Sequence, residues 1–140
     1  MDFNLSIGLQ AKVELTVEQK DTAEAFGSGG VKVFATPLMI GIMENAALRA
    51  VDPLLPEGFA TVGTHLDVKH LAATPIGMKA NAVAELIEVD GKRLVFKVEA
   101  FDEVEKIGEG LHERYIIQMD KFLSKVNKKG IVTNKDTSLF

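Results

Sequence analysis

The chain has 140 residues, of which 46% are hydrophobic and 26% are charged, and this is an ordinary composition for one globular domain with a real core. Sixteen Lys and Arg against 20 Asp and Glu give a net charge of -4, so no overall charge signature favours a nucleic acid partner. The chain has no cysteine, no signal-like opening and no apolar run of membrane-spanning length, so we expect a cytoplasmic protein without disulfides or thiolate metal sites.

The first regular pattern is an alternation over residues 11–17, where Val13, Leu15 and Val17 share one parity with polar residues between them. This alternation predicts a half-buried strand. Residues 27–30 read Gly-Ser-Gly-Gly and interrupt any regular element. They lack the Lys and the hydroxyl residue of a phosphate-binding loop, so we interpret them as a mobile lid or a plain linker.

A helix follows, with Thr36 in position to cap its N-terminus and Pro37 at its first helical position. Apolar residues continue through Leu48, and Asp52-Pro53 stops the run. Between positions 37 and 47 only two residues are polar, which indicates a helix surrounded by other structure on most sides.

One of those two polar residues is Glu44, an acid placed among Met, Ile and Ala residues. A carboxylate is costly to bury, so Glu44 needs either a structural ion-pair partner, such as a core Arg or His, or a chemical role. Both interpretations remain open from the sequence.

The rest of the chain predicts four long strands over residues 60–71, 78–89, 93–101 and 106–119. Asp90-Gly91 is typical of a hairpin turn, and adjacent strands are expected to be antiparallel. One helix followed by such a meander predicts an α+β fold in which a curved antiparallel sheet wraps around the helix. We expect one domain over residues 1–127 and, because no periodicity is visible beyond it, a flexible tail over residues 128–140.

Strand parity places His70 on the same face as Val62 and Val68, directed toward the helix that carries Glu44. His65 has the opposite parity and is expected on the surface, so the two histidines do not form a metal pair. We therefore predict no metal and no cofactor. In the last strand one face carries Gly108, Gly110, His112 and Arg114, where a ligand or another backbone can approach closely and Arg114 can meet an anion.

Structural roles compete with chemistry at several of these positions. Thr36 is often only a helix cap, and a single histidine at a strand end is usually a core or rim residue. Near the C-terminus, four lysines are interpreted as a solvated face, with a basic rim for an anionic cofactor as the alternative: Lys121, Lys125, Lys128 and Lys129.

Several short segments, taken in order, support a family resemblance. They are Val-Phe-Ala-Thr at 33–36, Gly-Ile-Met-Glu at 41–44, Gly-Thr at 63–64, His-Leu-Ala-Ala-Thr-Pro at 70–75, Gly-Lys-Arg-Leu at 91–94 and His-Glu-Arg at 112–114. In order and spacing, from about residue 33 to residue 126, they resemble the fluoroacetyl-CoA thioesterase group of hot-dog-fold thioesterases.

The resemblance implies a hot-dog homodimer that hydrolyses an acyl-CoA thioester. Thr36, Glu44 and His70 fall on the group's catalytic Thr, Glu and His, and Gly63 and Arg114 match its substrate-contacting Gly and Arg. No nucleic acid or membrane partner is implied.

These residue types fit the chemistry. His70 is expected to act as general base and acid, Glu44 to orient it or position water, and Thr36 to be either the acyl-accepting nucleophile or a water-positioning hydroxyl. The Gly63 N–H would donate to the carbonyl oxygen. Eight residues of helix place the backbones of Thr36 and Glu44 roughly 12 Å apart. Their cooperation therefore requires the substrate, His70 or a dimer interface between them.

The chain departs from the group at three places. Residues 27–30 stand where the group has a lid with phenylalanines, Asn45 replaces a bulky aromatic residue, and Pro37 follows Thr36. A short-chain acyl-CoA is therefore expected rather than fluoroacetyl-CoA in particular. Two other functions remain open, namely an acyl-thioester hydratase or dehydratase, whose usual Asp and His pair is not obvious, and a non-catalytic acyl-CoA-binding protein.

Overall fold

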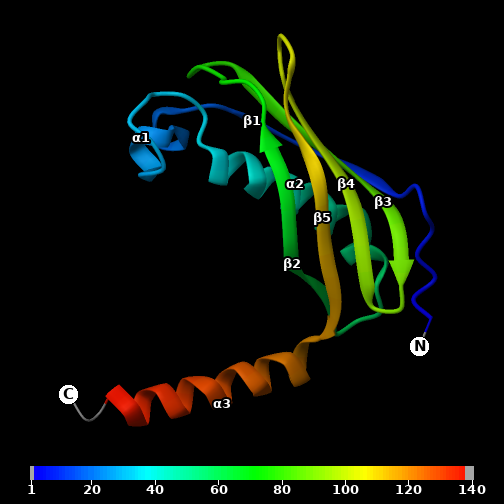
Figure 1. Ribbon diagram of the computed structural model, residues 1–140. Coiled ribbons are helices and arrows are strands. Elements are labelled where there is room, and N and C mark those ends of the chain that lie inside the picture. The colour runs from blue at the N-terminus through cyan, green and yellow to red at the C-terminus, as the bar shows by residue number, and fades with distance from the viewer. Residues whose placement is uncertain (1, 138–140) are drawn as a thin grey trace.

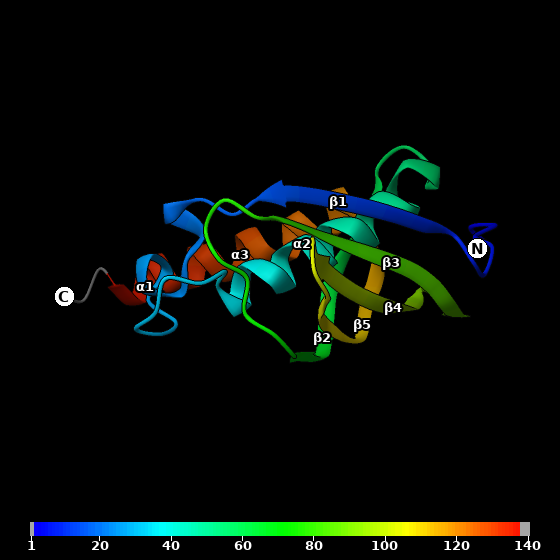
Figure 2. The ribbon, with the colours of Figure 1, turned by 90° about the horizontal axis from the view of Figure 1, so that it is seen from above.

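The computed structural model describes residues 2–137, and it consists of one curved antiparallel sheet with a helix in its concave face (Figures 1 and 2). The five strands lie in the order β1-β3-β4-β5-β2, so β2 and β1 form the two edges. The elements are β1 (Gln10–Thr16), α1 (Ala23–Phe26), α2 (Thr36–Val51), β2 (Phe59–His70), β3 (Lys79–Asp90), β4 (Arg93–Asp102), β5 (Lys106–Gln118) and α3 (Met119–Thr137), with short 3-10 turns at Gln19–Asp21 and Asp52–Leu54.

Helix α2 packs chiefly against β3 and β1, and its buried face supplies seven of the 20 buried residues of the hydrophobic core. The facing strand residues are small, because every second residue at the centre of β3 is a fully buried alanine. Small side chains let the helix axis approach the sheet closely, and larger ones from α2 fill the space. The fully buried residues at this contact are Met39, Met43, Ala46, Ala47, Val51, Ala80, Ala82, Ala84 and Ala100.

The start of α2 corrects one prediction. The N-cap is Ala35, with an extended backbone and no side-chain cap, and Thr36 is the first residue of the helix. Pro37 is thus one position later than expected, still within the first turn where its missing N–H has no helical partner. The Thr36 hydroxyl is therefore not the cap and is available to another group.

The predicted hairpin turn at Asp90-Gly91 is confirmed. Strands β3 and β4 pair as a hairpin closed at Gly91, which has φ of 61°, the left-handed region that glycine enters at no steric cost. Between β4 and β5, the Asp102 carboxylate accepts hydrogen bonds from the backbone N–H groups of Val104 and Glu105.

A β-bulge in β2 changes the predicted parity of that strand. The register with β5 shifts between Gly63 and His65, so one extra residue is accommodated there. Before the bulge the odd positions face α2, as buried Thr61 shows, and after it the even positions face inward, as Val68 and His70 show. The prediction that Val62 shares a face with His70 is therefore wrong, while the prediction for His70 itself is confirmed.

The C-terminal region also differs from expectation. No element was predicted after the last strand, which was expected to end at Met119, but α3 runs without interruption from Met119 to Thr137 and projects from the end of β5 away from the sheet (Figure 1). Its first residue is anchored, because Met119 N donates to the carbonyl of Gly58 at 2.8 Å. Residues 138–140 of the predicted tail lie outside the described residues. Over residues 2–137, no helix is long and apolar enough to cross a membrane.

Two glycine substitutions test this packing, because they are expected to change the free energy of unfolding in opposite directions. A Cβ on Gly110 would overlap the carbonyl oxygen of Asp67 and approach Val68 Cα to 2.6 Å, so Gly110→Ala must separate β5 from β2. A Cβ on Gly41 in α2 meets nothing within 4 Å. We expect Gly110→Ala to lower the free energy of unfolding by about 2 kcal/mol or more, and Gly41→Ala to raise it by about 0.5 to 1 kcal/mol, as measured by urea denaturation. Equal effects of the two changes would contradict this description of the β2–β5 contact.

Candidate functional site

The structure brings together two of the predicted catalytic residues, Thr36 and His70, although 34 positions separate them. Thr36 Oγ1 lies 2.7 Å from His70 Nδ1, a distance typical of a short hydrogen bond. Thr36 comes from the first turn of α2 and His70 from the last residue of β2. The hydroxyl donates to Nδ1 when the imidazole carries its proton on Nε2. This is the arrangement of a hydroxyl and its base.

The surroundings of His70 favour its neutral form. Burial lowers the pKa of the His70 imidazole below its ordinary value, and the backbone of Ala72 partly offsets this shift. A neutral imidazole at neutral pH is the form that accepts a proton. His70 Nε2 is buried and has no hydrogen-bond partner within the described part of the chain. An unpaired buried polar atom costs about 1 to 3 kcal/mol and is unusual outside functional sites.

A pocket opens beside this pair, bounded on one side by the loop after α1 and on the other by the segment after β2. Apart from Thr36 and His70, its only side-chain polar group is the Ser28 hydroxyl. The remaining walls are small or aliphatic, with one ring: Ala23, Gly29, Val31, Val33, Phe34, Leu71, Ala72 and Ala73.

A second polar cluster surrounds Gly63, in the middle of β2. The position that a Cβ on Gly63 would take lies 3.0 Å from Glu44 Oε2, 3.2 Å from His112 Cε1 and 3.4 Å from Arg114 Nη1. Three polar side chains thus converge on the backbone of one glycine, and a side chain at this position would displace them. Glu44 is only half-buried, so its carboxylate lies at the boundary of the core rather than inside it.

Arg114 is held by the protein on three sides. Its Nε donates to Thr61 Oγ1 at 2.8 Å, its Nη2 donates to the Thr61 carbonyl at 2.9 Å, and its Nη1 lies 3.1 Å from His112 Nε2. The Thr61 hydroxyl in turn donates to Asp52 at the C-terminus of α2, at 2.6 Å. The guanidinium is therefore fixed with an edge toward Glu44 and Gly63. Its predicted contact with substrate stays a prediction.

His112 is the residue of this cluster to which the sequence analysis assigned no role, although parity placed it on the face of Arg114. A guanidinium only donates, so His112 Nε2 must accept, and the proton sits on Nδ1, which donates to the His65 carbonyl at 2.8 Å. Burial lowers the pKa of the fully buried His112 imidazole, and the neighbouring Arg114 charge lowers it further. His112 is thus a neutral acceptor that fixes Arg114.

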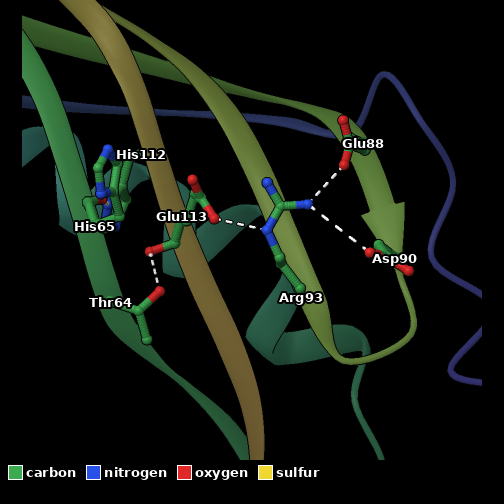
Figure 3. Close-up of polar contacts among 7 residues, drawn as sticks. All are labelled: Thr64, His65, Glu88, Asp90, Arg93, His112 and Glu113. Atoms are coloured by element: carbon green, nitrogen blue, oxygen red, sulfur yellow. Dashed lines mark hydrogen bonds and ion pairs between the residues drawn. The ribbon is translucent and has the colours of Figure 1, made fainter.

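The opposite face of the same strands carries an ion-pair network (Figure 3). Arg93 on β4 donates to Glu113 on β5 at 2.7 Å and to Glu88 on β3 at 2.7 Å. The hydrogen bond from Arg93 holds the pKa of the Glu113 carboxyl below its usual range. Glu113 therefore belongs to the outer surface, and Glu44 is the carboxylate that lies beside Gly63 and His112.

The structure does not join Glu44 to Thr36 and His70 within one chain. Two turns of α2 separate Thr36 from Glu44, and the helical rise corresponds to roughly 12 Å between their backbones. Each chain therefore presents two partial sites: the Thr36–His70 pair, and the Gly63 cluster formed by Gly63, Glu44, His112 and Arg114.

Comparison with known proteins identifies the family and the fold of the chain. Residues 17–120 match the family model of fluoroacetyl-CoA-specific thioesterases. Fluoroacetyl-CoA thioesterase of Streptantibioticus cattleyicolor is 47% identical over 98 residues, which is 70% of this chain and 70% of that protein. A mutant of the fluoroacetyl-CoA-specific thioesterase FlK in complex with fluoroacetate and CoA has a TM-score of 0.79 at 37% identity, over 84% of this chain and 99% of that one. A hot-dog-like protein from Thermanaerovibrio acidaminovorans has a TM-score of 0.84 at 27% identity, over 92% and 97%. The predicted hot-dog fold is confirmed.

Half-buried His70 and fully buried His112 predict how the free energy of unfolding depends on pH. Their pKa values are lowered in the folded chain, so below about pH 6.5 the unfolded chain binds more protons and the free energy of unfolding falls. Above that pH the protonation of these two histidines no longer lowers the free energy of unfolding. Urea midpoints at pH 7.5 and 5.5 should show the loss, and His112→Gln should reduce it, because glutamine offers Arg114 an acceptor without titrating. Exposed His65→Gln is the control, and an unchanged pH profile in His112→Gln would contradict the assignment.

Proposed function

The chain belongs to the family of fluoroacetyl-CoA-specific thioesterases, and from this membership we infer that it is an enzyme that hydrolyses an acyl-CoA thioester to the free acid and CoA. The observation that carries the assignment of its active site is the 2.7 Å contact between Thr36 Oγ1 and His70 Nδ1.

In the reaction that this pair supports, Thr36 Oγ attacks the thioester carbonyl carbon while its proton passes to His70 Nδ1. The carbon–sulfur bond then breaks, and His70 returns the proton to the departing CoA sulfur. Water attacks the resulting threonine ester, gives a proton to His70, and the proton returns to Thr36 as the acid leaves. In the alternative that the geometry also allows, Thr36 holds the water, and His70 deprotonates that water directly.

Trapping the enzyme separates these two routes. An acyl group on Thr36, detected by mass spectrometry after rapid acid quenching, would support the covalent route. Gly63 supports the carbonyl chemistry in either route, because it lies on an edge strand and has no side chain between its backbone and the incoming ligand. We propose that its N–H donates to the developing oxyanion.

We further propose that the enzyme is a homodimer formed through β2. This strand is at the edge of the sheet, has 12 residues, and exposes Leu66 by 40%, while Leu71 just after it is exposed by 50%. A long unpaired edge is open to antiparallel pairing with a second copy. Such pairing brings the His70 end of one strand beside the earlier half of the other, where Gly63 lies.

The proposed dimer would bring the two partial sites together across the interface. The Thr36–His70 pair of one subunit would face the Gly63 cluster of its neighbour, so that Glu44 of the partner subunit positions the water or orients His70. Each dimer would then hold two complete sites, each built from both chains. This arrangement uses Glu44 without requiring it to reach Thr36 along its own helix.

We propose a short-chain acyl group as the substrate, because the pocket beside Thr36 and His70 is lined by small and aliphatic side chains and its Gly-rich wall at residues 27–30 carries no aromatic ring. We also propose that hydrolysis needs no metal or cofactor and occurs in the cytoplasm. Activity lost to EDTA, or recovery of the enzyme outside the soluble cytoplasmic fraction, would contradict these two proposals.

Free thiol release from a panel of acyl-CoA esters tests the site. Thr36→Ala and His70→Ala should each lower kcat by about 100-fold or more while the fold, read by circular dichroism, is retained. Thr16→Ala is the control, since its side chain is exposed on β1, at the other edge of the sheet from β2, and it should keep a near-normal rate. Full activity in Thr36→Ala and His70→Ala would overturn the assignment. Binding of acyl-CoA without thiol release by the unmodified protein would instead indicate a non-catalytic binder.

Mixed dimers test the shared site. Thr36→Ala and Glu44→Ala chains, each inactive alone, should regain roughly a quarter to a half of the normal rate when co-expressed, because one of the two sites in a mixed dimer then has both residues intact. Light scattering of the unmodified protein at micromolar concentration should give the mass of two chains. A monomeric mass, or no recovery in proven mixed dimers, would contradict the proposal.

A further inference from the structure

The charge of this chain is unevenly distributed. Residues 119–140 contain five lysines and two aspartates, a net charge of +3 in a chain whose total is -4, which leaves -7 for residues 1–118. The substrate of an acyl-CoA thioesterase carries a 3′-phosphate and a diphosphate, so a body with this charge repels it. The positive charge of the chain is concentrated in and directly after helix α3.

The helix divides into two faces. Lys121, Lys125 and Lys128 recur at the i, i+4 and i+7 spacing of one face, are all exposed, and border a shallow groove with Asp120 and Ser124. Roughly opposite lies an apolar face that is also exposed: Met119, Phe122, Leu123 and Val126, at 37%, 37%, 44% and 48%. We name the first set the lysine face. In one chain α3 meets little besides β5, so neither face is covered by the body.

The anchor of α3 determines where these faces lie in the dimer. Met119 N bonds to the carbonyl of Gly58, directly before β2 begins at Phe59, so α3 starts beside the first residue of the edge strand. In an antiparallel β2–β2 pair, the start of one strand lies toward the end of the other, and that end is His70. Helix α3 projects from the sheet on the β2 side (Figure 1). In the proposed dimer it would therefore extend toward the Thr36–His70 pair of the other copy.

We propose that the lysine face of α3 binds the phosphates of the CoA whose acyl group occupies the Thr36–His70 pocket of the partner subunit. This proposal rests on the proposed thioesterase function and on the β2-mediated dimer. Ammonium groups spaced along a helix attract phosphate as point charges, and three of them on one face offset the repulsion from the acidic body. The apolar face packs against the partner and sets the direction of the helix.

Direct binding of CoA, measured by calorimetry, tests the lysine face without requiring turnover. We expect the triple change Lys121→Glu, Lys125→Glu and Lys128→Glu to weaken CoA binding at least about tenfold and to reduce its salt dependence. A control with Lys12→Glu, Lys20→Glu and Lys92→Glu, all at exposed positions, makes the same change in net charge. It should alter CoA binding less than about twofold. Equal effects in the two variants, or none in the first, would overturn the proposal.

Comparison of CoA with 3′-dephospho-CoA in the same experiment identifies the phosphate that is bound. A thioester of N-acetylcysteamine, which lacks the nucleotide, separates binding of phosphate from damage to the site. The triple variant should hydrolyse it with unchanged kcat and KM, whereas KM for the matching acyl-CoA rises. Equal loss toward both substrates would show a structural effect and contradict the proposal. If the unmodified protein cleaves neither thioester, the proposed function fails while the CoA measurement still decides the role of α3.

A mixed dimer determines which subunit the helix serves. One chain carries Thr36→Ala and the other carries the triple lysine change, so the only intact Thr36 faces an unmodified α3 if the helix acts across the dimer. We expect the mixed dimer to hydrolyse acyl-CoA with the normal KM. If each α3 serves its own chain, that KM remains as high as in the triple variant, and the placement across the interface is wrong.

Discussion

Small residues on the concave face of the sheet are the constraint on which the rest of this structure depends. Alanines of β3 and β4 and the glycines of β5 let α2 lie so close that a Cβ on Gly108 would come within 2.6 Å of Met39 Sδ. At this distance the helix needs no long side chain to reach the edge strand. The short side chain of Thr36 contacts His70 directly. Glu44 Oε2 lies 3.0 Å from the position that a Cβ on Gly63 would take. The proposed reactive groups thus stand on a helix and a strand and not on loops, which preserves their separation.

Burying an arginine beside a histidine is expensive, and the chain offsets this cost with a continuous set of hydrogen bonds from Asp52 through Thr61 and Arg114 to His112. Each polar atom along this path has a partner, whereas His70 Nε2 does not. The contrast separates the Arg114–His112 network, whose polar atoms are paired within one chain, from the His70 imidazole, which keeps one ring nitrogen free for a further contact.

Much of the fold was predictable because it follows from local patterns. Alternation over residues 11–17, the Asp90-Gly91 turn and the apolar run after Thr36 each specify an element without long-range information. The bulge near Thr64 was not predictable, since every residue around it fits a regular strand and only pairing with β5 reveals the shift. Helix α3 was missed because it is held by little tertiary contact and its polar residues hide a weak apolar face. The role of His112 depends on Arg114 folding back toward Thr61, a tertiary contact that no sequence spacing encodes.

The bulge has a consequence for how the sequence of β2 can change over time. Gly63 and His70 are separated by an odd number of positions, yet both side-chain directions point to the concave face because the strand gains one residue between them. Deleting Thr64 would remove the extra residue and leave an even number of positions between them, so a regular strand would also direct both to the concave face. The bulge is therefore the place where this strand can lose one residue without changing the face that Gly63 and His70 share, whereas a one-residue deletion after the bulge would turn one of them outward.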